Sequence, residues 1–226
     1  MAVTTQSELS RRLHEMRESV LLMGVLIEEA LQKVIFALET RDYDLADEIV
    51  RDDRRIDALE VQIDDHCTRI ISTTHPDERD LRDVLTTIKL TSALERVGDH
   101  ARHIARRARI ITGRAFVPTL PTIRTMIELN ITMLHDLLTA YVAGDADHAR
   151  EIATRDDELD RLHACHVAQV ATIMREGPEH IDKGLEVMLV SRSLERFGDQ
   201  ITNMCELVIL ARNAVHVELN GEHHDR

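Results

Sequence analysis

Apolar residues recur every three or four positions along most of the chain, which is the period of an amphipathic helix. In the first half of the chain this pattern predicts three long helices. The first runs from a capping box at residues 5–8 to about Thr40, the second follows an N-cap at Asp42, and the third begins near Pro76. The apolar stripe of the second helix consists of Ile49, Ile56, Leu59, Ile63 and Ile70. That of the third helix consists of Leu81, Val84, Ile88, Leu94, Val97, Ala101 and Ile104.

The second half of the chain repeats this pattern. The segment LERVGD at residues 94–99 returns as LERFGD at residues 194–199. Upstream of it, the sequence Asp-x-x-x-Asp that begins at Asp53 returns beginning at Asp156. A match over such distances in one chain points to two copies of a single structural unit.

The repeat predicts an all-α fold made of two tandem repeated three-helix bundles, with six long helices in total. The units are expected at residues 7–112 and 120–216. The segment between them contains two prolines, and residues 217–226 are predicted to be a disordered tail. In the second unit, Asp145 is the expected N-cap and Pro178 the expected start of the last helix.

A glycine lies in the middle of the last helix of each unit. Gly98 and Gly198 occupy positions where glycine costs a helix about 1 kcal/mol relative to alanine. Because the glycine occurs in both copies, we expect it to permit a close approach between helices.

Acidic residues line the side of these helices that faces away from the predicted core. On the third helix, Glu95 and Asp99 lie one turn apart, with His103 one turn further. Acids on the second helix line the edge of its apolar stripe, so the two rows converge if the helices are neighbours. We name the two sets the first-unit cluster and the second-unit cluster. Their members are Asp53, Asp57, Glu60, Glu95, Asp99 and His103 in the first unit, and Asp156, Asp160, His163, Glu195, Asp199 and Asn203 in the second.

Carboxylates gathered this closely repel one another unless a cation neutralises them. Carboxylate with imidazole suits iron, manganese or zinc, and carboxylate with amide oxygen also suits magnesium or calcium. Acidic pairs one turn apart are also common on hydrated helices, so a plain solvated face is the alternative. The presence of such pairs on two helices of both units favours metal binding.

The formal net charge of −13 argues against nucleic-acid binding, which needs a basic surface. The N-terminus lacks the pattern of a signal peptide and no apolar run is long enough to span a bilayer, so we expect a cytoplasmic protein. Cys67, Cys165 and Cys205 lie in apolar helical stretches and are expected to be buried free thiols. A local basic run is expected to be a solvated helix end that complements the helix dipole; it consists of Arg102, Arg106, Arg107 and Arg109.

The duplicated unit with its paired acidic motifs resembles the PhoU family over about residues 7–216. In that family the E(D)xxxD motifs bind multinuclear clusters of iron, zinc or other metals, and the resemblance implies this role for both clusters. The family pattern continues with Asn and then Glu, as at Asn203 and Glu206. The first unit has His103 and Arg106 there, and an arginine cannot ligate a metal. The second-unit cluster therefore matches the family more closely.

The resemblance implies a regulator rather than an enzyme. PhoU-like proteins act in bacterial phosphate homeostasis as negative regulators of the phosphate regulon and of phosphate uptake. They link the ATPase of the Pst phosphate ABC transporter to the sensor histidine kinase PhoR, usually as homodimers, and reach the membrane only through these partners. The implied cofactors are iron, zinc, manganese or magnesium ions.

Two other classes stay open on the residues alone. One is a metal-free helical adaptor whose acids are merely hydrated. The other is a di-metal carboxylate oxidase of the ferritin-like class, which needs Glu-x-x-His on two helices, and neither copy has that motif. The sequence also contains no GxSxG, P-loop, GxGxxG or HExxH motif, which disfavours an enzyme.

Overall fold

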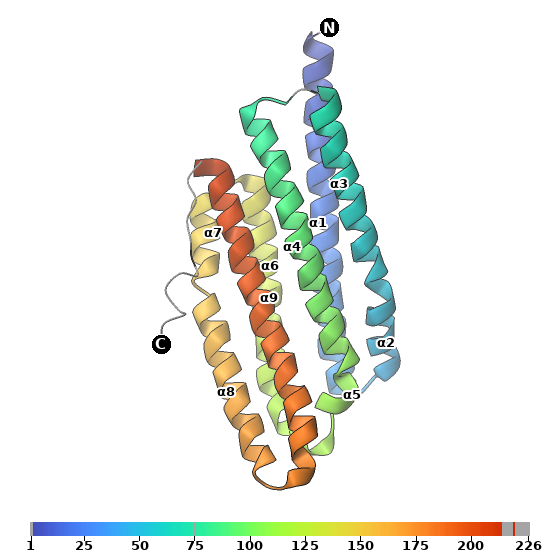
Figure 1. Cartoon of the computed structure of the whole chain (residues 1–226), viewed down its shortest axis with the longest axis vertical. Coiled ribbons are helices and arrows are strands. Elements are labelled where there is room, and N and C mark those ends of the chain that lie inside the picture. The colour runs from blue at the N-terminus through green and yellow to red at the C-terminus, as the bar shows by residue number, and fades with distance from the viewer. Residues whose placement is uncertain (1, 75, 214–218, 220–226) are drawn as a thin grey trace.

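The computed structural model describes residues 2–74, 76–213 and 219, and every regular element in these ranges is a helix (Figure 1). The elements of the first unit are α1 (Ala2–Thr40), α2 (Tyr43–Asp52), α3 (Arg54–Thr74), α4 (Glu78–Arg106) and the short α5 (Ala108–Ile111). A 3-10 helix, η1 (Arg114–Thr119), leads to α6 (Leu120–Ala143), α7 (Ala146–Ala153), α8 (Asp156–Met174), η2 (Pro178–His180) and α9 (Ile181–Asn213).

The all-α, duplicated three-helix fold is confirmed, with one difference in each middle helix. The structure divides that helix into α2 and α3 at Asp53, and into α7 and α8 at residues 154–155. At both places the backbone tightens: the N–H of Ile56 bonds the carbonyl of Asp53 at 2.9 Å, and the N–H of Arg155 bonds the carbonyl of Ile152 at 3.0 Å. These bonds span three residues instead of four, so the middle helix bends and a new helix starts beside the acidic residues.

Two of the predicted helix starts are confirmed by capping bonds. Oδ1 of Asp42 accepts the N–H of Leu45 at 3.0 Å, and Oδ1 of Asp145 accepts the N–H of His148 at 3.0 Å. The predicted start of the first helix is wrong, because α1 already begins at Ala2. The capping box at residues 5–8 therefore lies inside the helix.

The two units pack side by side and share one hydrophobic core. The last helices of the units, α4 and α9, lie against each other in the middle of the molecule, and α1 packs against α6 (Figure 1). One continuous cluster of buried side chains runs from the first unit into the second. The unit boundaries at 7–112 and 120–216 stay a prediction, and the tail at 217–226 lies outside the described residues except for Leu219.

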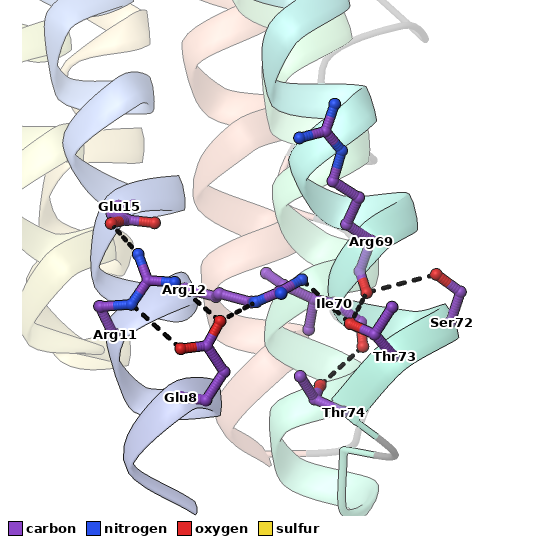
Figure 2. A network of polar contacts seen from close by, with 9 residues as sticks. All are labelled: Glu8, Arg11, Arg12, Glu15, Arg69, Ile70, Ser72, Thr73 and Thr74. Atoms are coloured by element: carbon purple, nitrogen blue, oxygen red, sulfur yellow. Dashed lines mark hydrogen bonds and ion pairs between the residues drawn. The ribbon is translucent and has the colours of Figure 1, made fainter. Parts of the chain in front are cut away.

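Polar contacts join the N-terminal part of α1 to the C-terminal end of α3. Arg12 donates to Glu8 at 2.7 Å and to the hydroxyl of Thr73 at 3.0 Å, as Figure 2 shows. Arg11 bridges Glu8 and Glu15 along the same face of α1. The contacts of Arg11 are exposed, so each adds little to stability.

The environments of the three thiols differ from the prediction at one position. Cys67 and Cys205 are buried as expected, whereas Cys165 is exposed on α8. Cys165 lies on the outer side of α8, next to the buried His166. Across the described ranges, no helix is both long and apolar enough to cross a membrane.

Candidate metal centre

The second-unit cluster forms where the start of α8 meets the middle of α9. Asp156 is the first residue of α8, because the middle helix is interrupted directly before it. The free N–H groups of a helix start favour a carboxylate at this position. Glu195 and Asp199 lie one turn apart on α9, and α8 and α9 are packed neighbours. The predicted convergence of the two acidic rows is confirmed.

Gly198 allows this convergence. A Cβ atom at this position would overlap Leu159 and would lie 2.8 Å from Oδ1 of Asp156. At Gly98 a Cβ would lie 3.1 Å from Ile56 and 3.8 Å from Oδ1 of Asp53, so the same approach is looser in the first unit. The prediction that both glycines permit a close approach between helices is confirmed.

The carboxylates of the second-unit cluster destabilise one another's charge. The pKa of Asp156 is raised to about 7, first by burial and then by the neighbouring carboxylates of Asp199, Asp160 and Glu195 in that order. Asp156 has no ion-pair partner in the ranges that the structure describes. Asp156 therefore lies among other carboxylates without a basic side chain paired to it in that part of the chain.

The pKa of Glu195 is also raised, although nearby arginines oppose the shift. Burial raises its pKa, Arg192 and Arg196 oppose the shift, and Asp160 adds to it. One of its oxygens, Oε2, is buried and accepts no hydrogen bond from any described residue. The imidazole Nδ1 of His163 is buried and unpartnered in the same way. Such atoms are the ligands that a cation would satisfy.

Asn130 adds a fully buried polar group that sequence reasoning missed. Its amide nitrogen donates to the carbonyl of Leu194 at 3.0 Å, which fixes the side chain between α6 and α9. Its Oδ1 has no partner in the described chain and lies 3.7 Å from the position that a Cβ of Gly198 would occupy. The repeat held the signal, because the equivalent residue of the first unit is the apolar Ile27.

The first-unit cluster is organised around an arginine. One guanidinium nitrogen of Arg102 forms an ion pair with Asp53, and another lies 2.5 Å from Oδ1 of Asp99. Asp53 is 6% exposed and the side chain of Arg102 is 22% exposed. The prediction that Arg102 belongs to a solvated helix end is therefore wrong, because the side chain turns back over the acids of its own unit.

The remaining first-unit acids lie around this pair. Burial raises the pKa of Glu95, and the charges of Asp99, Glu60 and Asp57 raise it further. The pKa of His103 is lowered by burial and then by Arg102. The predicted rows thus meet in the first unit as well, although Asp57 is exposed at the edge.

The outer members of the second-unit cluster reach solvent. Asp160 and Asn203 are exposed, one on α8 and one on α9. Within the described residues, no group of three or more His, Cys, Asp or Glu side chains is already arranged to hold a metal ion. Metal binding by either cluster stays a prediction, and cation binding would require side chains to turn toward one another.

Together these features define a class of protein: a helical protein of two duplicated three-helix units, each with an acidic cluster between its last two helices. The family model for the PhoU domain matches residues 20–108 and again residues 123–208. The chain therefore belongs to the PhoU family.

Known proteins of this family are similar along nearly the whole chain. The phosphate-specific transport system accessory protein PhoU of Serratia marcescens is 35% identical over 201 residues, which cover 89% of this chain and 83% of that protein. The crystal structure of PhoU from Pseudomonas aeruginosa has a TM-score of 0.84 at 32% identity and covers 91% of this chain and 99% of its own. The crystal structure of the phosphate transport system regulatory protein PhoU from Streptococcus pneumoniae has a TM-score of 0.86 at 29% identity, with 93% and 99% covered.

Proposed function

We propose that this chain is an accessory protein of a phosphate-specific transport system, and that it acts as a negative regulator of phosphate uptake and of the phosphate regulon. The observation that carries this proposal is the match to proteins of that name over 89% of the chain and 83% of the relative. A regulator of this kind is a cytoplasmic adaptor and not an enzyme. Its partners are the transporter ATPase and the PhoR-type sensor kinase, and it works as a homodimer.

The second-unit cluster is proposed to bind metal ions. Its residues fit a cation: Asp156 is partly buried and forms no ion pair within the described chain, and Oε2 of Glu195 and Nδ1 of His163 lack hydrogen-bond partners there. Carboxylate and imidazole groups suit iron, zinc or manganese, and carboxylates with the amide of Asn203 also suit magnesium. A bound cation would supply positive charge that keeps these acids ionised and joins α8 to α9.

The acidic rows of α8 and α9 then provide a rigid surface on which a regulatory partner docks. Asp160 and Asn203 are exposed at the edge of the cluster, so a partner can reach them. With Asp156 held ionised, α8 and α9 keep one relative position, and the surface that they form stays the same from one encounter to the next. Docking of this surface shifts the partner kinase toward its phosphatase activity.

The double variant Glu195→Ala/Asp199→Ala tests this proposal. Elemental analysis of the purified protein should show a loss of bound metal, because two ligands of the second-unit cluster are removed. In cells, a reporter of the phosphate regulon should become active in phosphate-rich medium. Asp147→Ala is the matched control, because this acid of the same unit has a side chain that is 93% exposed and lies outside the cluster.

Two results separate the alternatives. Loss of both metal and repression in a variant with the helicity of the wild type supports the metal-dependent regulator. Intact repression in a folded variant that has lost its metal contradicts the metal-dependent form and leaves the metal-free adaptor. Circular dichroism measured on the same samples confirms that the variant is folded.

A further inference from the structure

The two units differ in the residue that lies three positions after Asp99 of α4 and Asp199 of α9. The last helices of the units align at a separation of 100 residues, so Arg102 of α4 corresponds to Thr202 of α9. Arg102 brings a permanent positive charge to this position, whereas Thr202 brings a short neutral side chain. The two acids that Arg102 contacts have acidic counterparts in the second unit: Asp53 corresponds to Asp156, and Asp99 to Asp199.

In the first unit, the guanidinium occupies the space between the two acidic rows. It forms an ion pair with Asp53 at the break between α2 and α3, and with Asp99 on α4 at 2.5 Å. A cation that joined the same two rows would need these carboxylate oxygens and would also face the charge of Arg102 at close range. Arg106 and Arg107 add to the positive potential near His103.

In the second unit, the corresponding side chain cannot play this role. Thr202 is 1% exposed, and its hydroxyl has no hydrogen-bond partner among the described residues. Asp156 has the equivalent place to Asp53 but makes no ion pair in the described chain. Asn130 directs an unpartnered oxygen into the same region, where the first unit has Ile27.

We propose that Arg102 is a built-in counter-cation that closes the first-unit cluster to metal ions, so that the chain binds metal in its second unit alone. This inference rests on the proposed metal binding of the second-unit cluster. Both units need positive charge between their acidic rows, because the rows converge where a glycine lets the two helices approach closely. In the first unit the side chain of Arg102 supplies this charge, and in the second unit a metal ion from solution supplies it.

Exchanging the two residues between the repeats tests the proposal. The full-length protein is stripped with a chelator, titrated with manganese or zinc chloride, and assayed by calorimetry and by elemental analysis after gel filtration. Arg102→Thr should raise the molar ratio of bound metal about twofold, because it opens an equivalent site in the first unit. Thr202→Arg should abolish metal binding, because it places a guanidinium where the ion would lie.

A variant with a disabled second-unit cluster shows which unit binds the additional metal. In the Glu195→Ala/Asp199→Ala protein, the second-unit cluster is disabled and the metal ratio should be near zero. Adding Arg102→Thr to this protein should restore binding, now in the first unit. Arg102→Lys is the matched control, since it keeps the positive charge and should keep the first unit closed.

The outcomes of this test differ from those of the proposed function. If Arg102→Thr binds no more metal than the wild type, the inference is overturned, whether or not the wild type binds any. If the wild type binds none but Arg102→Thr does, closure by arginine is supported while metal binding by the second unit fails. Arg102→Gln repeats the comparison with a longer neutral side chain, in case the threonine variant does not fold.

Discussion

At the scale of single residues, the repeat exposes one polar side chain in a core position. His166 of α8 corresponds to Ile63 of α3, and both are 0% exposed. Neither ring nitrogen of His166 has a hydrogen-bond partner in the described ranges. Burial lowers the pKa of His166 to about 4, with a smaller contribution from His163. The fold therefore holds this imidazole neutral and unsatisfied, which costs stability.

Replacing the imidazole by the residue of the other repeat should stabilise the protein. We expect His166→Ile to raise the free energy of unfolding by about 1–2 kcal/mol at neutral pH, because a buried polar group without partners is removed. The difference in the free energy of unfolding between the variant and the wild type should grow as the pH falls from 6.5 toward 4. In that window the unfolded wild type takes up a proton on His166 and the folded wild type does not, so the wild type loses stability through this residue and the variant does not.

Urea unfolding at pH 7.5, 6 and 5 in the presence of a chelator measures this effect. His14→Gln is a suitable control, since the side chain of His14 is 73% exposed. An advantage of His166→Ile that stays constant over this pH range would contradict the assignment of the pH dependence to this imidazole.

The same comparison shows which site residues a sequence can reveal. Glu195 and Asp199 were predictable, because helical periodicity places them on one face and the repeat marks them as a pair. The ion pairs of Arg102 were not, because its side chain also reaches Asp53, which lies 49 positions away on another element. The position of Asn130 between α6 and α9 likewise depends on how closely those helices approach. Helical periodicity therefore identifies the candidate metal ligands, but only the packing of the helices shows which of these acids already form an ion pair with an arginine.

At the scale of elements, the repeat preserves an ion pair and reverses its charges. In the first unit, Lys33 of α1 lies 3.6 Å from Asp52 at the end of α2. In the second unit, the equivalent positions hold Asp136 of α6 and Arg155 before α8, at 2.5 Å. Each pair ties the first helix of its unit to the break in the middle helix. The sequence pattern predicted the helices, but the division of the middle helix depends on bonds that no periodicity encodes.

Reversing the pair in the second unit should therefore be tolerated. Arg155→Asp alone places two carboxylates face to face, and we expect it to lower the free energy of unfolding by about 1 kcal/mol, since both side chains are partly exposed. The double variant Asp136→Lys/Arg155→Asp copies the first unit and should recover most of that loss. Urea unfolding of the wild type, both single variants and the double variant gives the coupling energy. A double variant no more stable than Arg155→Asp would show that the pair does not hold the two elements together.

At the scale of the whole molecule, the two units depend on each other. The contact of α4 with α9 and that of α1 with α6 bury apolar faces of both units in one core (Figure 1). A polar network crosses the same boundary: Thr87 of α4 and Tyr141 of α6 are joined by a hydrogen bond of 2.6 Å between their hydroxyl groups. Nearby, Asp83 of α4 accepts from Arg17 at 2.8 Å and lies 3.9 Å from Arg212 of α9. The duplicated sequence alone suggested two bundles, and the packing makes them one.

A chain with one shared core should unfold in one step. We expect circular dichroism and the exposure of the buried thiols Cys67 and Cys205 to report the same urea midpoint, although these thiols belong to different units. A fragment that ends at Gly113 would expose the faces of α1 and α4 that α6 and α9 cover. It should bind a hydrophobic dye and lack a cooperative transition, because its core is left open on one side. A fragment that unfolds cooperatively at the midpoint of the whole chain would instead establish the first unit as an independent domain.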